Sequence, residues 1–256
     1  MTSEAIQELG TLASLTVENY VKAIFKICLT EDNPRATTGQ IAVALAVSPG
    51  TVTSMLKTLS ESRLASYTPY EGVRLTDAGN QLAMRILRRH RLIETFLAQT
   101  LEMGWDEVHD DAEQMEHVIS DNLIDRIAAR LGHPQFDPHG DPIPTPDGQM
   151  PLVQTHSLAD CPADTPFRLA RVMDQSTDFL RYLSQSGLHL NVQGRVLAQR
   201  IEAGAITIEV EGRQTTLGRE AAAKLQVAVG EDLALPERVS VVPGPHFGGQ
   251  KARVTL

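Results

Sequence analysis

The hydrophobic and polar positions near the start of the chain repeat with a helical period. In residues 15–29 the apolar side chains return every three or four positions, which places them on one face of an α-helix. They are Val17, Tyr20, Val21, Ile24, Ile27 and Cys28. Residues 37–47 follow with a threonine pair suited to an N-cap, and residues 48–65 begin with Ser48 as N-cap and Pro49 at the first helical position. The pattern predicts three helices.

Residues 66–76 change to two short β-prone arms around Glu71-Gly72, which is a hairpin signal. A helix, a short turn, a second helix and a hairpin form the order of a winged helix-turn-helix, in which the second helix of the motif enters the major groove of DNA. Here that helix offers small hydroxyl groups suited to close approach to phosphates and thymine methyls. The candidate DNA-binding residues are Ser48, Pro49, Gly50, Thr51, Ser54 and Lys57. The same pattern also fits a three-helix module that contacts proteins.

Beyond the hairpin the pattern predicts long helices and then a β-rich region. Residues 76–132 are expected to be helical, capped by Thr76-Asp77 and broken near Met103-Gly104. Residues 133–166 hold eight of the fourteen prolines, which indicates a linker or extended arm. Strands are then expected at 167–173, 194–201 and 205–212, a helix at 177–187, and a turn at about 218–224 leading into a last strand that ends near 229. This set is typical of a small β-barrel.

The composition bears on where the protein is located and on which partners it can bind. The chain has 256 residues, a formal net charge of −9 and two cysteines, Cys28 and Cys161. Its N-terminus is polar and acidic, and no apolar run approaches the roughly 20 residues of a membrane helix. We therefore expect a cytoplasmic protein with no membrane partner and no disulfide framework. Because a negative chain is a poor general ligand for nucleic acid, DNA contact must come from a local surface.

Histidines and carboxylates recur at helical spacing in residues 90–117. His90 and Glu94 are four positions apart, and a second set falls at i, i+4, i+7 and i+8. That set is His109, Glu113, Glu116 and His117. On a helix each set lies on one face, and such a mixture suits a divalent cation such as Mn²⁺, Fe²⁺ or Zn²⁺. The alternative is a solvated acidic helix with incidental histidines, since residues 102–125 hold nine acidic residues and no Lys or Arg.

Three blocks in order, RRHRLIETFL, WDEVHDDAEQMEHVIS and DPHGDPIP, resemble the diphtheria-toxin-repressor family of metal-dependent transcription regulators. The resemblance runs from about Leu15 to Val229. It implies a mainly α fold with a small β domain. The implied domains are a winged helix-turn-helix at 1–75, a helical metal-binding and dimerisation domain at 76–136, a proline-rich linker at 137–166 and an SH3-like β-barrel at 167–230. The tail at 231–256 has no predicted structure.

The same resemblance implies two metal sites. The primary site would use Asn19, Glu113, Glu116 and His117. The ancillary site would use His90, Glu94 and His109, with Gln175 and Asp178 added from the barrel. For Asp178 the alternative is the N-cap of a helix.

Two positions refine this expectation. Glu113 stands where the iron-responsive branch of the family has cysteine, and a carboxylate there is similar to the manganese-responsive branch and suits Mn²⁺. Asn19 and Lys22 stand where regulators that pair two metals at the primary site have acidic residues, so two separated sites are expected.

The sequence thus predicts a homodimeric, manganese-activated regulator that represses metal-uptake genes through a palindromic DNA operator. Fe²⁺ is the alternative effector, and Zn²⁺ or Co²⁺ are expected to substitute in vitro. Metal would join the first helix, through Asn19, to the acidic helix. A metallohydrolase is the rival from the enzymes, but no H-E-x-x-H motif occurs. A winged-helix regulator that senses an organic ligand is the other rival.

Overall fold

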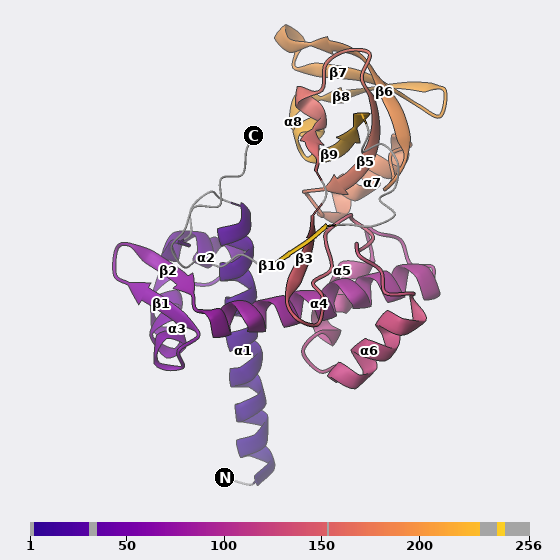
Figure 1. Cartoon of the computed structure of the whole chain (residues 1–256). Helices are drawn as coiled ribbons and strands as arrows, with labels where there is room; N and C mark the ends of the chain where they lie inside the picture. The colour runs from indigo at the N-terminus through magenta and orange to yellow at the C-terminus, as the bar shows by residue number, and fades with distance from the viewer. Residues whose placement is uncertain (1–2, 31–34, 153, 231–239, 244–256) are drawn as a thin grey trace. The chain divides into compact units, whose positions relative to one another are not determined.

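A computed structural model describes residues 3–30, 35–152, 154–230 and 240–243 (Figure 1). The chain divides into two compact units. The first consists of Met1–Arg88, Pro144–Gln149 and Pro243–Leu256, and the second of Arg89–Ile143 and Met150–Val242. No single helix in the described ranges is long and apolar enough to cross a membrane, although the bent pair formed by Thr38–Ala44 and Pro49–Glu61 meets that test together.

The first unit contains the winged helix-turn-helix. Helix α1 spans Ser3–Thr30, α2 Thr38–Ala44 and α3 Pro49–Glu61, and strands β1 (Ala65–Thr68) and β2 (Gly72–Leu75) form an antiparallel hairpin. The predicted caps are confirmed. Thr37 forms a capping box with Gln40, and the Ser48 side chain accepts a hydrogen bond from the Thr51 amide. Helix α4 (Asp77–Thr100) begins in this unit.

The second unit opens with the rest of α4, followed by α5 (Val108–Met115) and α6 (Asp121–Arg130). Their apolar faces form one core. The expectation that one helix carries the whole set from His109 to His117 is wrong at its end. Helix α5 ends at Met115, and Glu116 and His117 lie in the turn after it. Ser120 has an extended backbone and caps α6 by accepting a hydrogen bond from the Leu123 amide, so α5 cannot continue through this position.

The barrel is a six-stranded antiparallel sheet in the order β4-β9-β5-β6-β7-β8. Its strands are β4 His156–Ser157, β5 Pro166–Val172, β6 Gln193–Arg200, β7 Ala205–Val210, β8 Arg213–Gly218 and β9 Leu225–Val229. Helix α7 (Thr177–Gln185) lies between β5 and β6, and a short helix α8 (Arg219–Ala223) occupies the position of the predicted turn. Two 3-10 turns, η1 (Leu158–Asp160) and η2 (Ile201–Ala203), complete the β-rich region, and alternate strand residues fill one apolar core.

The proline-rich segment is more ordered than a linker. It contains β3 (Gln149–Leu152), which pairs with β10 (Ser240–Pro243) from the tail. Its first part is a buried loop that includes Asp137, His139 and Asp141. Gly140 in this loop has φ +86°, and a Cβ there would lie 2.0 Å from the Ala170 carbonyl oxygen of β5, so only glycine allows this approach.

Candidate metal centre

Two ionisable residues lie on the buried face of α4. His90 and Glu94 are 3% and 1% exposed, and their spacing of four puts them on one face of the helix. His90 Nε2 lies 3.0 Å from Glu94 Oε1. Burial of such groups is costly unless partners or a cation compensate it, so this pair is a candidate for a metal site.

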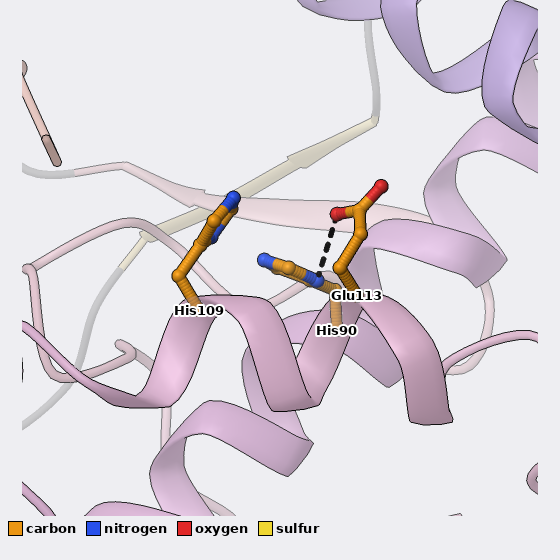
Figure 2. A group of neighbouring side chains, drawn as sticks. All are labelled: His90, His109 and Glu113. Atoms are coloured by element: carbon orange, nitrogen blue, oxygen red, sulfur yellow. Dashed lines mark ion pairs between the residues drawn. The ribbon is translucent and has the colours of Figure 1, made fainter.

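The other nitrogen of His90 faces the end of α5. His90 Nδ1 lies 2.6 Å from Glu116 Oε2 and 3.7 Å from Glu113 Oε2, and Figure 2 shows the Glu113 side chain pointing toward the ring. Glu116 is fully buried. His90 therefore contacts carboxylates of both predicted metal sites.

Three residues of the predicted primary site come together. The ligand atoms of Glu113, Glu116 and His117 all lie within 4.8 Å of one another, and His117 Nε2 is 3.3 Å from Glu116 Oε1. Asn19 belongs to the first unit, whereas Glu113, Glu116 and His117 belong to the second. The Asn19 Oδ1 atom is buried and accepts no hydrogen bond from any described residue.

The predicted ancillary residues also come together, around Glu94. Glu94 Oε1 lies 3.2 Å from His109 Nδ1 as well as 3.0 Å from His90 Nε2. The His90 and His109 rings meet edge to face with their centroids 5.0 Å apart (Figure 2). His90, His109 and Glu113 can also offer ligand atoms within 4.8 Å of one another. The His109 side chain is 40% exposed, so it lies on the solvent side of the group.

A third group was missed by the sequence reasoning. Glu94, Asp137 and His139 are all buried, with ligand atoms within 4.8 Å of one another. His139 Nε2 lies 2.7 Å from the Trp105 carbonyl oxygen, which can only accept, so Nε2 carries the hydrogen. His139 Nδ1 makes no hydrogen bond within the described residues and lies 3.8 Å from Glu94 Oε2. The D-x-H of the DPHGDPIP block was the available signal.

The two buried acids of this group, Glu94 and Asp137, have pKa values shifted in opposite directions. Burial alone would raise the pKa of Glu94, but the contacts of His109 and His90 outweigh it and hold the pKa well below its ordinary value. Burial, followed by the charges of Asp141 and Glu94, raises the pKa of Asp137 well above its ordinary value, although Arg91 opposes the change. Glu94 is thus ready to bind a cation as a carboxylate.

Gln175 and Asp178, the two barrel residues predicted for the ancillary site, do not belong to the groups of potential ligands described above. Gln175 Nε2 donates to Asp141 Oδ2 at 3.2 Å, and Asp141 also pairs with Arg91 and Arg171. Asp178 is exposed in the first turn of α7. The alternative that Asp178 is the N-cap is wrong, because Ser176 holds that position.

The six predicted DNA-binding residues are accessible to solvent. They are all exposed on or just before α3, and the opposite face of the helix buries Val52, Leu56 and Leu59. The Ser48 and Thr51 hydroxyls are 2.8 Å apart. Residues 35–88 hold six basic and three acidic side chains, a net charge of +3 in a chain of −9. This local excess suits an acidic polymer such as DNA.

Three family descriptions match successive parts of the chain. They are the N-terminal DNA binding domain of iron dependent repressors at residues 14–73, their metal binding and dimerisation domain at 76–145, and the FeoA domain at 156–229.

Individual relatives are similar to larger or smaller shares of the chain. The transcriptional regulator MntR of Bacillus pumilus is 37% identical over 112 residues, 44% of this chain and 76% of its own length. The iron-dependent repressor IdeR of Mycobacterium tuberculosis is 28% identical over 83% of this chain and 96% of its own. A manganese-dependent transcriptional repressor solved in complex with manganese is 38% identical, with a TM-score of 0.76 over 83% of this chain and 99% of that structure.

Proposed function

The chain belongs to the iron-dependent repressor family of metal-dependent, DNA-binding transcription regulators, and we propose that Mn²⁺ activates it to repress metal-uptake genes. The observation that carries the choice of metal is Glu113. It places a carboxylate, and no thiolate, beside Glu116 and His117. Hard oxygen ligands with one imidazole suit Mn²⁺ better than softer metals, and Fe²⁺ is the alternative.

The donor atoms fit a first ion at the Glu113–Glu116–His117 group. Two carboxylates and one imidazole leave coordination positions open for further oxygen ligands. We propose from the family resemblance that Asn19 is one of them, and its buried, unpartnered Oδ1 supports this role. When bound, the ion would supply the positive charge that this acidic group needs.

The second ion, we propose, is centred on Glu94. One oxygen of this carboxylate faces His90 and His109, and the other faces the unpartnered Nδ1 of His139. His139 therefore joins the predicted ancillary ligands. Gln175 and Asp178 stay candidates from the resemblance alone.

The partners and location are proposals as well. We propose a cytoplasmic homodimer on a palindromic operator, with the domain limits at residues 75, 136, 166 and 230 suggested by the sequence. The family description of residues 76–145 as a dimerisation domain supports the dimer, and two buried cysteines that form no disulfide with each other are compatible with a reducing compartment.

Metal-dependent DNA binding tests this function. Fluorescence anisotropy with operator DNA should show specific binding with Mn²⁺ and its loss with EDTA. Equal affinity in both conditions would remove the metal from the mechanism and favour a regulator that senses an organic ligand. A panel of Mn²⁺, Fe²⁺, Zn²⁺ and Co²⁺ under anaerobic conditions ranks the effectors.

A further inference from the structure

We propose that Asp141 fastens the β5 side of the barrel to α4 without a metal ion, and that it thereby places His139 for the second ion. The docking stands on contacts within the chain, whereas the placement of His139 rests on the function proposed above. Asp141 is 8% exposed and lies in the buried loop that carries His139. Its carboxylate contacts α4 on one side and the barrel on the other.

The contact on the α4 side is made by Arg91. The Arg91 side chain is 6% exposed, and its Nη2 donates to Asp141 Oδ2 at 3.0 Å. Its Nη1 donates to the Pro142 carbonyl oxygen, and its Nε lies 3.6 Å from Asp137 Oδ2. A buried charge is costly once its partners leave, so this guanidinium ties the loop to the helix at three positions.

On the barrel side, two side chains donate to the same carboxylate. Arg171 of β5 donates through Nε to Asp141 Oδ1, and Gln175, shortly after β5, donates through Nε2 to Asp141 Oδ2 at 3.2 Å. The backbones also meet, because the Val172 amide donates to the His139 carbonyl oxygen at 2.9 Å. An ion pair, a side-chain hydrogen bond and a backbone hydrogen bond therefore hold β5 against the loop.

These contacts need no cation to balance them. The Asp141 carboxylate lies between the guanidinium groups of Arg91 and Arg171, and both of its oxygens accept hydrogen bonds. Hydrogen bonds between ionised partners are among the stronger ones in proteins, and burial reduces their screening by salt. We therefore expect the β5 side of the barrel to be docked in the metal-free protein.

The same contacts fix His139 beside Glu94. The His139 amide donates to Asp137 Oδ1 at 2.8 Å, and its carbonyl oxygen accepts from Val172. With its backbone held on both sides, His139 keeps Nδ1 3.8 Å from Glu94 Oε2. Contacts that orient a metal ligand typically contribute about 10- to 100-fold to metal affinity, so the second ion should bind more tightly because Asp141 is present.

The family resemblance offers a competing arrangement. It implies that Gln175 binds the second ion, so that the metal itself would dock the barrel. Gln175→Glu separates the two arrangements. A carboxylate is a stronger ligand than an amide oxygen, so metal-driven docking predicts a higher affinity for the second ion. In the arrangement proposed here, the lost NH₂ group leaves two carboxylates facing each other at Asp141 and weakens docking.

Hydrogen exchange of the Val172 amide in the full-length protein with EDTA measures docking, because this amide donates across the contact. In the wild type it should be protected, and Asp141→Asn and Gln175→Glu should each speed its exchange about tenfold. Arg219→Gln is the control, since it removes an ion pair with Asp160 elsewhere in the β-rich region. Amides shared by β7 and β8 should stay protected in every variant, which shows that the barrel is folded.

The wild-type result alone decides the docking, even where a variant does not fold. A Val172 amide that exchanges freely in EDTA and becomes protected only with Cd²⁺ overturns metal-free docking and supports docking by the ion. Equal acceleration in Arg219→Gln and Asp141→Asn also overturns it, because a general loss of stability would then be the cause.

A Mn²⁺ titration followed by electron paramagnetic resonance tests the placement of His139. Asp141→Asn should keep the number of bound ions, lower the affinity for the second about tenfold and leave the first within about threefold. An unchanged affinity for the second ion overturns the placement of His139 and leaves the docking intact. A wild-type chain that binds no Mn²⁺ overturns the proposed function instead, while Val172 still reports docking in EDTA.

Discussion

At the scale of single residues, we expect Glu113 to determine which metals the proposed first site prefers. Replacing it by Cys changes a hard oxygen donor to a soft thiolate in the group with Glu116 and His117. We expect Glu113→Cys to move the preference from Mn²⁺ toward Fe²⁺, Co²⁺ or Zn²⁺, by about tenfold in relative affinity, or about 1.4 kcal/mol. Competition titrations measure the ranking.

The control for this change is Gln114→Cys, which adds a thiol at an exposed position of the same helix. An unchanged metal ranking in Glu113→Cys would mean that Glu113 does not contact the ion.

Asp137 carries a second residue-scale prediction, which concerns pH. Because its pKa is raised in the folded protein, the fold gains most from the protonated form and loses that stability as pH rises through the raised pKa. Asp137→Asn removes the charge and keeps the oxygen that accepts the His139 and Asp141 amides. Without metal, it should therefore raise Tm at neutral pH, since each unit of raised pKa costs about 1.4 kcal/mol.

Thermal unfolding between pH 4 and pH 8 in EDTA measures this effect. The gain of Asp137→Asn over the wild type should shrink toward acid, where Asp137 is protonated in both states. A gain that is constant with pH would mean that the charge of Asp137 is not its source.

At the scale of elements, the sequence predicted the helix starts that depend on contacts between residues close together in the chain. The caps at Thr37 and Ser48 and the helices that follow them depend on neighbours three residues away, and both were found. Ser120 was a local signal that a new helix begins soon after Met115. The helical spacing of the histidines and carboxylates instead favoured one continuous helix through His117. The spacing still paired His90 with Glu94, because i and i+4 lie on one face.

The position of His139 beside Glu94 could not be predicted from the periodicity of the sequence. Its loop is far from Glu94 in sequence, and its position depends on tertiary contacts. The His139 carbonyl accepts a hydrogen bond from the Val172 amide of β5, and Trp105 stacks on the ring with centroids 6.3 Å apart. Periodicity carries no information about such contacts, so the third group became visible only in the folded chain.

Helix α3 carries the prediction for DNA. Thr51 and Lys57 are exposed on it, while its other face packs into the core. Thr51→Ala and Lys57→Ala should each weaken operator binding about tenfold without changing metal stoichiometry, and Lys57→Ala should also reduce the salt slope by about one. Arg213→Ala, an equal charge change on an exposed position of β8, is the control. If α3 variants and control behave alike, another element contacts the DNA.

At the scale of the whole molecule, the residues around Glu94 and the strands of the barrel belong to the same compact unit. Trp105, the single tryptophan, stacks on His139 and donates through Nε1 to the Ser184 hydroxyl of α7 at 2.9 Å. Beside it, Asp106 pairs with Arg181 of α7 at 2.8 Å. The turn that holds Trp105 and Asp106 therefore contacts both His139 and α7, and we expect an ion at the proposed Glu94 site to stabilise these contacts.

Tryptophan fluorescence and hydrogen exchange test this link. Adding diamagnetic Cd²⁺ should change Trp105 emission and slow amide exchange in α7 by about tenfold, because His139 becomes fixed between the ion and the Trp105 carbonyl. His139→Ala should remove both responses and one bound ion, yet keep the ion at Glu113, Glu116 and His117. His189→Ala, on an exposed histidine of the barrel, should leave them intact. Protection of α7 that persists in His139→Ala would show that the barrel docks independently of the second ion.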